Sequence, residues 1–224
     1  MKIKICGITT PDDARLVADA GADAIGLNFV AGPRRIDLAQ AEGILDALPP
    51  LVVPVALVQL TDGLLNEQVA ELLATRWIAT IQIYGEVTPA AVTRLAWEGY
   101  RPIVPVHVRD ETFAQTVPAV LATDRGRGAA AILLDTPHAD KLGGTGQSFA
   151  WSWLRQARQR GELDAWPPVL LAGGLTPDNV AAAIETARPY GVDVASGVED
   201  EPGRKSPEKV RRFIAEARRA SKSE

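Results

Sequence analysis

The sequence predicts an α/β protein built as a single (β/α)8 barrel, also called a TIM barrel. Eight short apolar runs recur along the 224 residues, and each is followed by a segment with helical spacing. Runs such as 51 to 58 are apolar at nearly every position, which is typical of parallel strands covered on both faces. Eight alternations of strand and helix are what a closed barrel requires, whereas a doubly wound sheet usually needs fewer.

The apolar runs give the expected strands. They lie at 2 to 6, 23 to 29, 51 to 58, 79 to 84, 101 to 108, 129 to 135, 168 to 173 and 191 to 196. The connections between them are short and leave no room for a second domain. We therefore expect residues 1–224 to form one barrel domain with a short frayed C-terminal end.

Three helix starts are marked by a capping residue followed by proline, a pairing favoured in the first turn of a helix. They are Thr10-Pro11, Thr176-Pro177 and Ser206-Pro207. The second predicts a helix near 177 to 187, and the third predicts that Ser206 caps the last helix.

Composition excludes several classes of protein. The single cysteine rules out an internal disulfide, and the chain has neither a long apolar run nor a charged and apolar leader. We expect a soluble, cytoplasmic protein that does not associate with a membrane. The net charge of −4 and the lack of a basic stripe argue against nucleic acid as a partner. His107 and His138 lack the spacing of a zinc site, so no metal is expected.

In a (β/α)8 barrel the site forms where the strands end. Cys6 closes the first expected strand and Asp135 closes the sixth. A lone cysteine is most often a small buried hydrophobe, so a packed thiol is the alternative to a catalytic one. An aspartate after an apolar run is costly unless it is paired or lies at the mouth. Its alternative role is to cap the turn at Thr136-Pro137.

Glycine-rich stretches follow the last three expected strands. Glycine lets backbone N–H groups approach an anion closely, and the loops after strands seven and eight usually bind phosphate in such barrels. Tight turns are the alternative explanation. The expected phosphate-binding residues are Gly144, Gly146, Gly173, Gly174, Ser196 and Gly197.

Two sets of charged residues also lie near strand ends. Arg34 and Arg35 follow the second strand, where a guanidinium could hold a substrate carboxylate with two hydrogen bonds, although surface arginines are usually only solvated. Lys4 shares a strand face with Cys6 and needs a counter-charge if that face points into the barrel. Asp193 on the eighth strand is the candidate, and we interpret the pair as structural with an influence on Cys6.

Several motifs together closely resemble phosphoribosylanthranilate isomerase, over residues 2 to about 205. They are Lys4-Ile5-Cys6-Gly7-Ile8-Thr9, Gly21-Ala22-Asp23-Ala24-Ile25-Gly26, Gly143-Gly144-Thr145-Gly146, Leu171-Ala172-Gly173-Gly174-Leu175, Asn179-Val180 and Val192-Asp193-Val194-Ala195-Ser196-Gly197-Val198-Glu199. The resemblance implies an Amadori rearrangement in tryptophan biosynthesis that needs no cofactor. Its substrate is a small phosphosugar, N-(5-phosphoribosyl)anthranilate, and the expected assembly is a monomer or homodimer.

The resemblance also implies residue roles. Cys6 matches the general base that takes the proton from C2 of the opened sugar, and Asp135 matches the general acid on the ring oxygen. Arg34 matches the arginine that holds the anthranilate carboxylate. A modest lowering of the thiol pKa would suit a base at neutral pH.

Tyr84 is the main departure from the family pattern. The family usually reads Val-Gln-Leu-His-Gly where this chain reads Ile81-Gln82-Ile83-Tyr84-Gly85. Tyrosine keeps a hydroxyl donor but not an imidazole. Two alternatives follow: a related histidine-pathway sugar isomerase, which has an aspartate where Cys6 stands, and a non-catalytic phosphosugar-binding paralogue whose Tyr84 marks lost activity.

Overall fold

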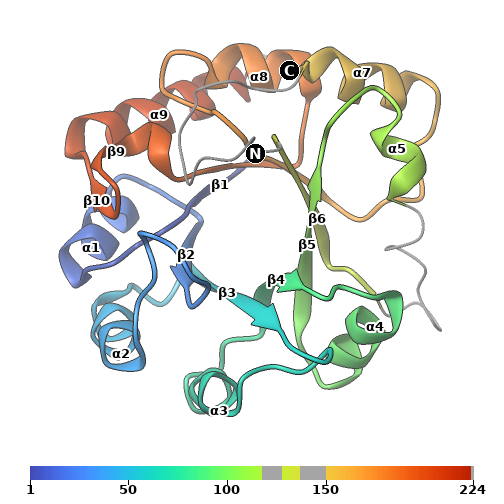
Figure 1. Cartoon of the computed structure of the whole chain (residues 1–224). Helices are drawn as coiled ribbons and strands as arrows, with labels where there is room; N and C mark the ends of the chain where they lie inside the picture. The colour runs from blue at the N-terminus through green and yellow to red at the C-terminus, as the bar shows by residue number, and fades with distance from the viewer. Residues whose placement is uncertain (118–127, 137–149, 223–224) are drawn as a thin grey trace.

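The computed structural model describes residues 1–117, 128–136 and 150–222, and its centre is a closed barrel of eight parallel strands (Figure 1). The strands pair in chain order and β1 pairs with β8, so the predicted (β/α)8 fold is confirmed. They are β1 (Lys2–Ile5), β2 (Ala24–Asn28), β3 (Val53–Leu60), β4 (Thr80–Gly85), β5 (Arg101–His107), β6 (Ala131–Asp135), β7 (Val169–Leu171) and β8 (Gly191–Val194).

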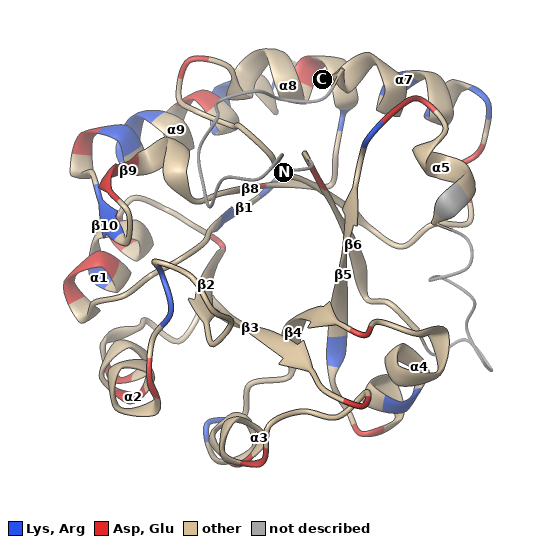
Figure 2. Cartoon of the chain, viewed as in Figure 1, with Lys and Arg blue, Asp and Glu red and all other residues tan. Residues whose placement is uncertain are grey.

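Helices surround the barrel and carry most of the charged residues, while the strands are largely uncharged (Figure 2). The α-helices are α1 (Pro11–Asp19), α2 (Leu38–Ala47), α3 (Glu67–Thr75), α4 (Pro89–Trp97), α5 (Phe113–Thr116), α7 (Trp151–Gln159), α8 (Val180–Ala187) and α9 (Pro207–Ala220). After β8 come a 3-10 turn, η1 (Ser196–Val198), and a small hairpin, β9 (Glu199–Glu201) with β10 (Arg204–Lys205). No helix in the described part of the chain has both the length and the apolar character needed to cross a bilayer.

Apolar residues cover both faces of the barrel strands, as the near-continuous apolar runs predicted. Successive side chains of a strand point to opposite faces, so Ile3 and Ile5 of β1 pack outward under the helices and are fully buried. A smaller apolar cluster fills the inside of the barrel. Its members are Val55, Ile103, Ala131, Leu133, Leu170 and Ala172.

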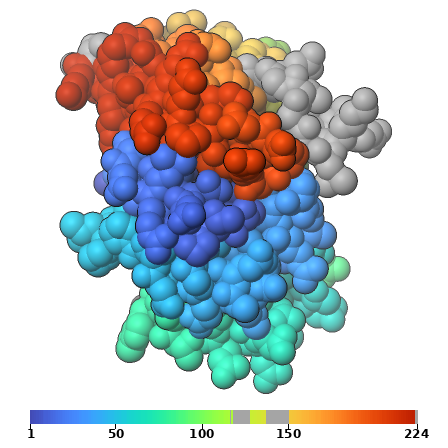
Figure 3. Space-filling model, turned by 90° about the vertical axis from the view of Figure 1, so that its left-hand side faces the viewer, coloured from blue at the N-terminus to red at the C-terminus, as the bar shows by residue number. Residues whose placement is uncertain are grey.

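The barrel closes where β1 meets β8, with Lys4 opposite Asp193. In Figure 3 the red C-terminal segment lies directly against the blue N-terminal segment. The helix α9 packs against α1 and α8, and its Phe213 belongs to the hydrophobic core and is fully buried. Arg218 of the same helix donates to the Met1 carbonyl and to the Asp23 carboxylate, at 2.7 Å each. The two ends of the chain therefore stabilise each other.

The third strand begins at Val53 rather than at the predicted residue 51. Leu51 is 92 % exposed and lies in a turn closed by a hydrogen bond from the Val52 N–H to the Pro49 carbonyl. The two prolines before it favour this turn, so the apolar run enters the sheet two residues later than its composition suggested.

The helix starts were predicted with mixed success. Thr10 caps α1 as expected, because its hydroxyl accepts a hydrogen bond from the Asp13 N–H. The helix α8 begins at Val180 instead of 177, since the Asn179 side chain accepts from the Thr176 N–H at 2.8 Å and holds these residues in a turn. Ser206 is the N-cap residue of α9 as predicted, but its side chain makes no capping bond to the helix.

Phe213→Ala should lower the free energy of unfolding by about 3–5 kcal/mol, because it leaves a cavity in the hydrophobic core. Leu51→Ala is the matched control at an exposed position and should change stability by no more than about 0.5 kcal/mol. Urea denaturation of the two variants measures the difference. Equal stability losses would show that Phe213 of α9 does not contribute to this core.

Candidate functional site

The carboxyl ends of the barrel strands surround a cavity of about 220 Å³. Sequence reasoning placed the site at this end, and the cavity brings most of the expected residues together. Those that line it are Cys6, Arg34, Tyr84, Asp135, Gly173, Gly174, Ser196 and Gly197. Gly144 and Gly146 lie outside the described residues.

Cys6 follows the last residue of β1, and its N–H donates to the Val194 carbonyl at 2.8 Å. The thiol is nearly buried and lies against Gly26 of β2. A Cβ at Gly26 would stand only 2.6 Å from the sulfur, so this position must be glycine for the thiol to occupy its place.

A buried charged pair lies next to the thiol. Lys4 Nζ is 2.9 Å from Asp193 Oδ1, and both side chains are almost fully buried, as the sequence predicted for the closing strands. Burial alone would lower the pKa of Lys4, but Asp193 and Cys6 hold that pKa above its usual range. Lys4 therefore keeps its positive charge, and this charge favours the thiolate of Cys6.

The pKa of Cys6 is raised above its usual range. Burial is the largest cause, because it disfavours the thiolate. Lys4 acts in the opposite direction and Asp193 adds to the increase. The lowering that would suit a base at neutral pH is absent, since burial at this strand end outweighs the adjacent ammonium.

Asp135 ends β6 and is only partly buried at the cavity wall. Its Oδ1 accepts a hydrogen bond from the Thr136 N–H at 2.8 Å, so it also caps the following turn. Gly173 of the next loop lies very close, because a Cβ there would be 2.9 Å from the same oxygen. The two roles considered for Asp135, turn cap and site residue, are thus compatible.

The loops after β7 and β8 approach each other through glycine. Gly173 and Gly174 have φ angles of +84° and +64°, and within the described chain their N–H groups have no acceptor. Asn179 donates to the Gly174 carbonyl at 2.9 Å and holds this loop in place. A Cβ at Gly197 would stand 1.8 Å from the Leu175 carbonyl oxygen, so the second loop can pack there only as glycine.

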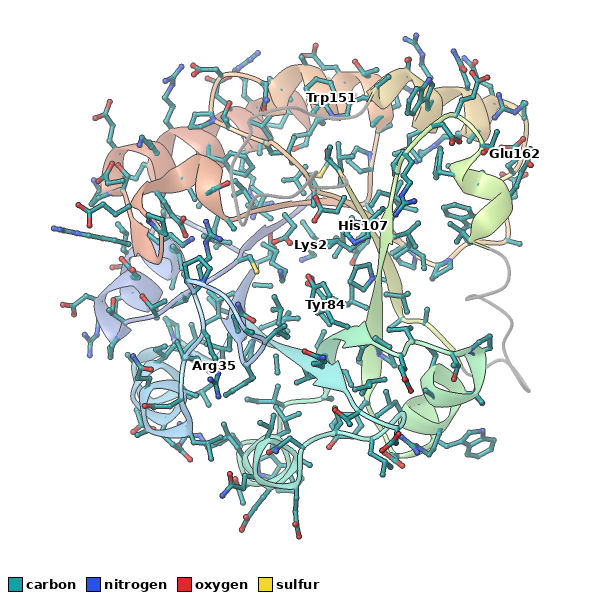
Figure 4. The ribbon with its side chains drawn as sticks, viewed as in Figure 1. Lys2, Arg35, Tyr84, His107, Trp151 and Glu162 are labelled. Atoms are coloured by element: carbon teal, nitrogen blue, oxygen red, sulfur yellow. The ribbon has the colours of Figure 1, made fainter. Side chains whose placement is uncertain are left out.

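Arg34 and Arg35 lie in different surroundings. Arg34 lines the cavity and packs over Gly7, whereas Arg35 is exposed near α2 and does not line it (Figure 4). Arg34 donates from Nε and Nη2 to the two carboxylate oxygens of Glu199, at 2.8 and 2.7 Å. Glu199 in turn accepts from the buried Lys205 at 2.7 Å. Burial alone would raise the pKa of Glu199, but the positive charges of Arg34 and Lys205 lower that pKa overall.

Sequence reasoning missed three residues of this site: Glu199, Lys205 and Gln82. Glu199 lay inside a recognised motif without a role assigned to it, and Lys205 lies in the hairpin that follows this motif. Gln82 precedes Tyr84 by two positions, the spacing of one strand face, and that signal could have found it. The described residues contain no group of three or more His, Cys, Asp or Glu side chains that could hold a metal.

Known proteins match the whole chain. The family model for N-(5'phosphoribosyl)anthranilate (PRA) isomerase matches residues 3–216. N-(5'-phosphoribosyl)anthranilate isomerases of Trichlorobacter lovleyi and Pseudomonas fluorescens are each 40% identical, over 98% and 100% of this chain and 99% and 98% of their own sequences.

Solved structures agree. The crystal structure of phosphoribosyl anthranilate isomerase from Thermotoga maritima has a TM-score of 0.82 at 31% identity, covering 97% of this chain and 98% of that one. A second structure, in complex with reduced 1-(o-carboxyphenylamino)-1-deoxyribulose 5-phosphate, has a TM-score of 0.79 at 30% identity, with the same coverage. The resemblance found in the motifs is confirmed, and the chain belongs to the phosphoribosylanthranilate isomerase family.

Proposed function

We propose that this protein converts N-(5-phosphoribosyl)anthranilate to 1-(2-carboxyphenylamino)-1-deoxyribulose 5-phosphate in tryptophan biosynthesis, by general acid and base catalysis without a cofactor. The observation that carries the proposal is a single cavity that unites Cys6, Asp135, Arg34 and two glycine loops. The substrate offers a carboxylate, a phosphate and two sites of proton transfer, and the cavity has a matching group for each.

The reaction needs an acid and a base at different atoms. Asp135 protonates the ring oxygen, the bond from that oxygen to C1 breaks, and the nitrogen takes up the positive charge as a Schiff base. Cys6 then removes the C2 proton, and the electron pair forms the C1–C2 double bond of an enolamine. Loss of the hydroxyl proton at C2 and protonation of C1 give the ketone, with no net oxidation.

The surroundings of Cys6 suit a base that acts after ring opening. Its raised pKa keeps the thiol protonated in the empty site at neutral pH. The Schiff base then brings a positive charge next to the sulfur and favours the thiolate, together with Lys4. Proton removal is in this way coupled to the arrival of the opened substrate.

The two anionic ends of the substrate have separate partners. Arg34 holds the anthranilate carboxylate while Glu199 fixes the other edge of its guanidinium through Nε and Nη2. The backbone N–H groups of Gly173, Gly174, Ser196 and Gly197 hold the phosphate. Several properties stay predictions from the sequence. They are the binding of phosphate by Gly144 and Gly146, a cytoplasmic location, a single domain, and a monomeric or homodimeric assembly.

The alternatives make different demands on the same cavity. The histidine-pathway isomerase would have an aspartate where Cys6 stands. A non-catalytic phosphosugar-binding protein would need the glycine loops and Arg34, but it has no use for a thiol and a carboxylate in the same cavity. The presence of both favours the enzyme.

Cys6→Ser and Asp135→Asn should each lower turnover by roughly 10² to 10⁴, because each removes one proton-transfer group. The assay follows the loss of substrate fluorescence after addition of freshly prepared phosphoribosylanthranilate. Both variants should still bind the reduced product, since the carboxylate and phosphate contacts are intact. A folded Cys6→Ser protein with near-wild-type turnover would return Cys6 to the role of a packed thiol.

The thiol of Cys6 should titrate above the ordinary pKa of a cysteine, near 8.5, because burial is the largest influence on it. A base must lose its proton to act, so kcat/KM should rise with pH well into the alkaline range. As Cys6 is the only cysteine, thiolate absorbance measures this pKa when the titration of Cys6→Ser is subtracted. A midpoint at or below the ordinary value would contradict the prediction.

Arg34→Ala should abolish recognition of the anthranilate carboxylate, and Arg35→Ala should not. The reduced product and an analogue lacking the carboxylate form the test pair for calorimetry. With wild-type protein the carboxylate should strengthen binding roughly 10- to 100-fold, as hydrogen bonds between charged groups do. The ratio of the two affinities should fall to about one in Arg34→Ala, even if the Glu199 side chain moves after it loses its partner. A ratio preserved in Arg34→Ala would reject the assignment.

A further inference from the structure

Tyr84 and Gln82 form a hydrogen-bonded pair on the inner face of β4. The Gln82 Nε2 donates to the Tyr84 hydroxyl at 2.5 Å. Both residues line the cavity, and Tyr84 points toward the centre of the ring of strands (Figure 4). Gln82 is 1 % exposed, so the amide is held deep in the barrel beneath the phenol.

This pair leaves hydrogen-bonding groups unused. The Tyr84 oxygen accepts from Gln82, and within the described residues its own proton has no acceptor. The buried Gln82 Oε1 likewise has no partner among these residues. Buried polar groups are normally satisfied, and leaving one without a partner destabilises the protein. A buried phenol with a donor to spare, at the wall of a cavity, indicates a ligand that supplies the missing acceptor.

The chemistry of that ligand follows from the neighbours. Tyr84 lines the same cavity as Cys6 and Asp135. Its pKa is raised, mainly by burial and further by these two groups, so the phenol stays neutral. Cys6 acts at C2 of the sugar and Asp135 at the ring oxygen in the proposed reaction. A neutral donor near both faces the part of the sugar that carries the 2- and 3-hydroxyl groups.

We propose that Tyr84 donates a hydrogen bond to the 2- or 3-hydroxyl oxygen of the substrate sugar, and that Gln82 is the positioning residue that aims the phenol. The inference rests on the proposed function of the cavity. A sugar hydroxyl oxygen accepts hydrogen bonds, so it matches the spare donor of Tyr84. Tyr84 is then a substrate-binding residue and not a sign of lost activity.

Tyr84→Phe removes the donor and keeps the ring. It should lower kcat/KM for phosphoribosylanthranilate roughly three- to tenfold and weaken binding of the reduced product, which keeps the sugar hydroxyls, by a similar factor. Tyr190→Phe makes the same change at an exposed position outside the cavity and should change neither quantity. Unchanged kcat/KM and unchanged binding in Tyr84→Phe would overturn the proposal.

Gln82→Met tests the positioning role. It should lower kcat/KM as Tyr84→Phe does, yet have little further effect in the Tyr84→Phe background, because Gln82 acts through the phenol. If Gln82 only packs in the core, Gln82→Met should lower the melting temperature and leave kcat/KM and ligand binding unchanged. That result would overturn the proposal. Additive effects of the two substitutions on kcat/KM would overturn it as well. Wild-type turnover is measured in parallel, and its absence would reject the proposed function itself.

Discussion

The arrangement of the site depends on the buried ion pair of Lys4 and Asp193. The contact, 2.9 Å between Nζ and Oδ1, joins the first strand to the last at the point where the barrel closes. Removing two charges from water is costly unless their geometry is good, so this pair is poor evidence for stability. Its effect on position is clearer. Because Lys4 and Cys6 share a strand face, the pairing of β1 with β8 that closes the barrel also fixes the positive charge of Lys4 beside the thiol.

The fold was predictable from local pattern, whereas the ends of its elements were not. Eight apolar runs with helical spacing between them required a barrel, and their lack of alternation showed that both faces would be covered. The start of β3 at Val53 depends on the turn at Pro49, and the start of α8 depends on the Asn179 side chain. Such boundaries are decided by particular hydrogen bonds, which composition does not reveal.

Position at a strand end was enough to predict Cys6, Asp135 and the glycine loops after β7 and β8 as cavity residues. It was not enough to separate Arg34 from Arg35, because that choice depends on which side chain packs over Gly7. Glu199 lies 165 residues from Arg34 along the chain, and only barrel closure brings it to the guanidinium. The raised pKa of Cys6 was also out of reach, since burial is a property of the assembled cavity.

The inside of the barrel is layered, and this explains how the site tolerates a departure from the family pattern. A step of two residues along a strand moves from one inner layer to the next, so Lys4 stands beneath Cys6 and Gln82 beneath Tyr84. In each case a buried polar group lies beneath a residue that lines the cavity. In the family pattern glutamine also precedes the histidine by two positions. An amide can hydrogen-bond to an imidazole or to a phenol, so the layer beneath need not change when tyrosine replaces histidine. The replacement keeps a donor at the cavity wall and removes a group that would titrate near neutral pH.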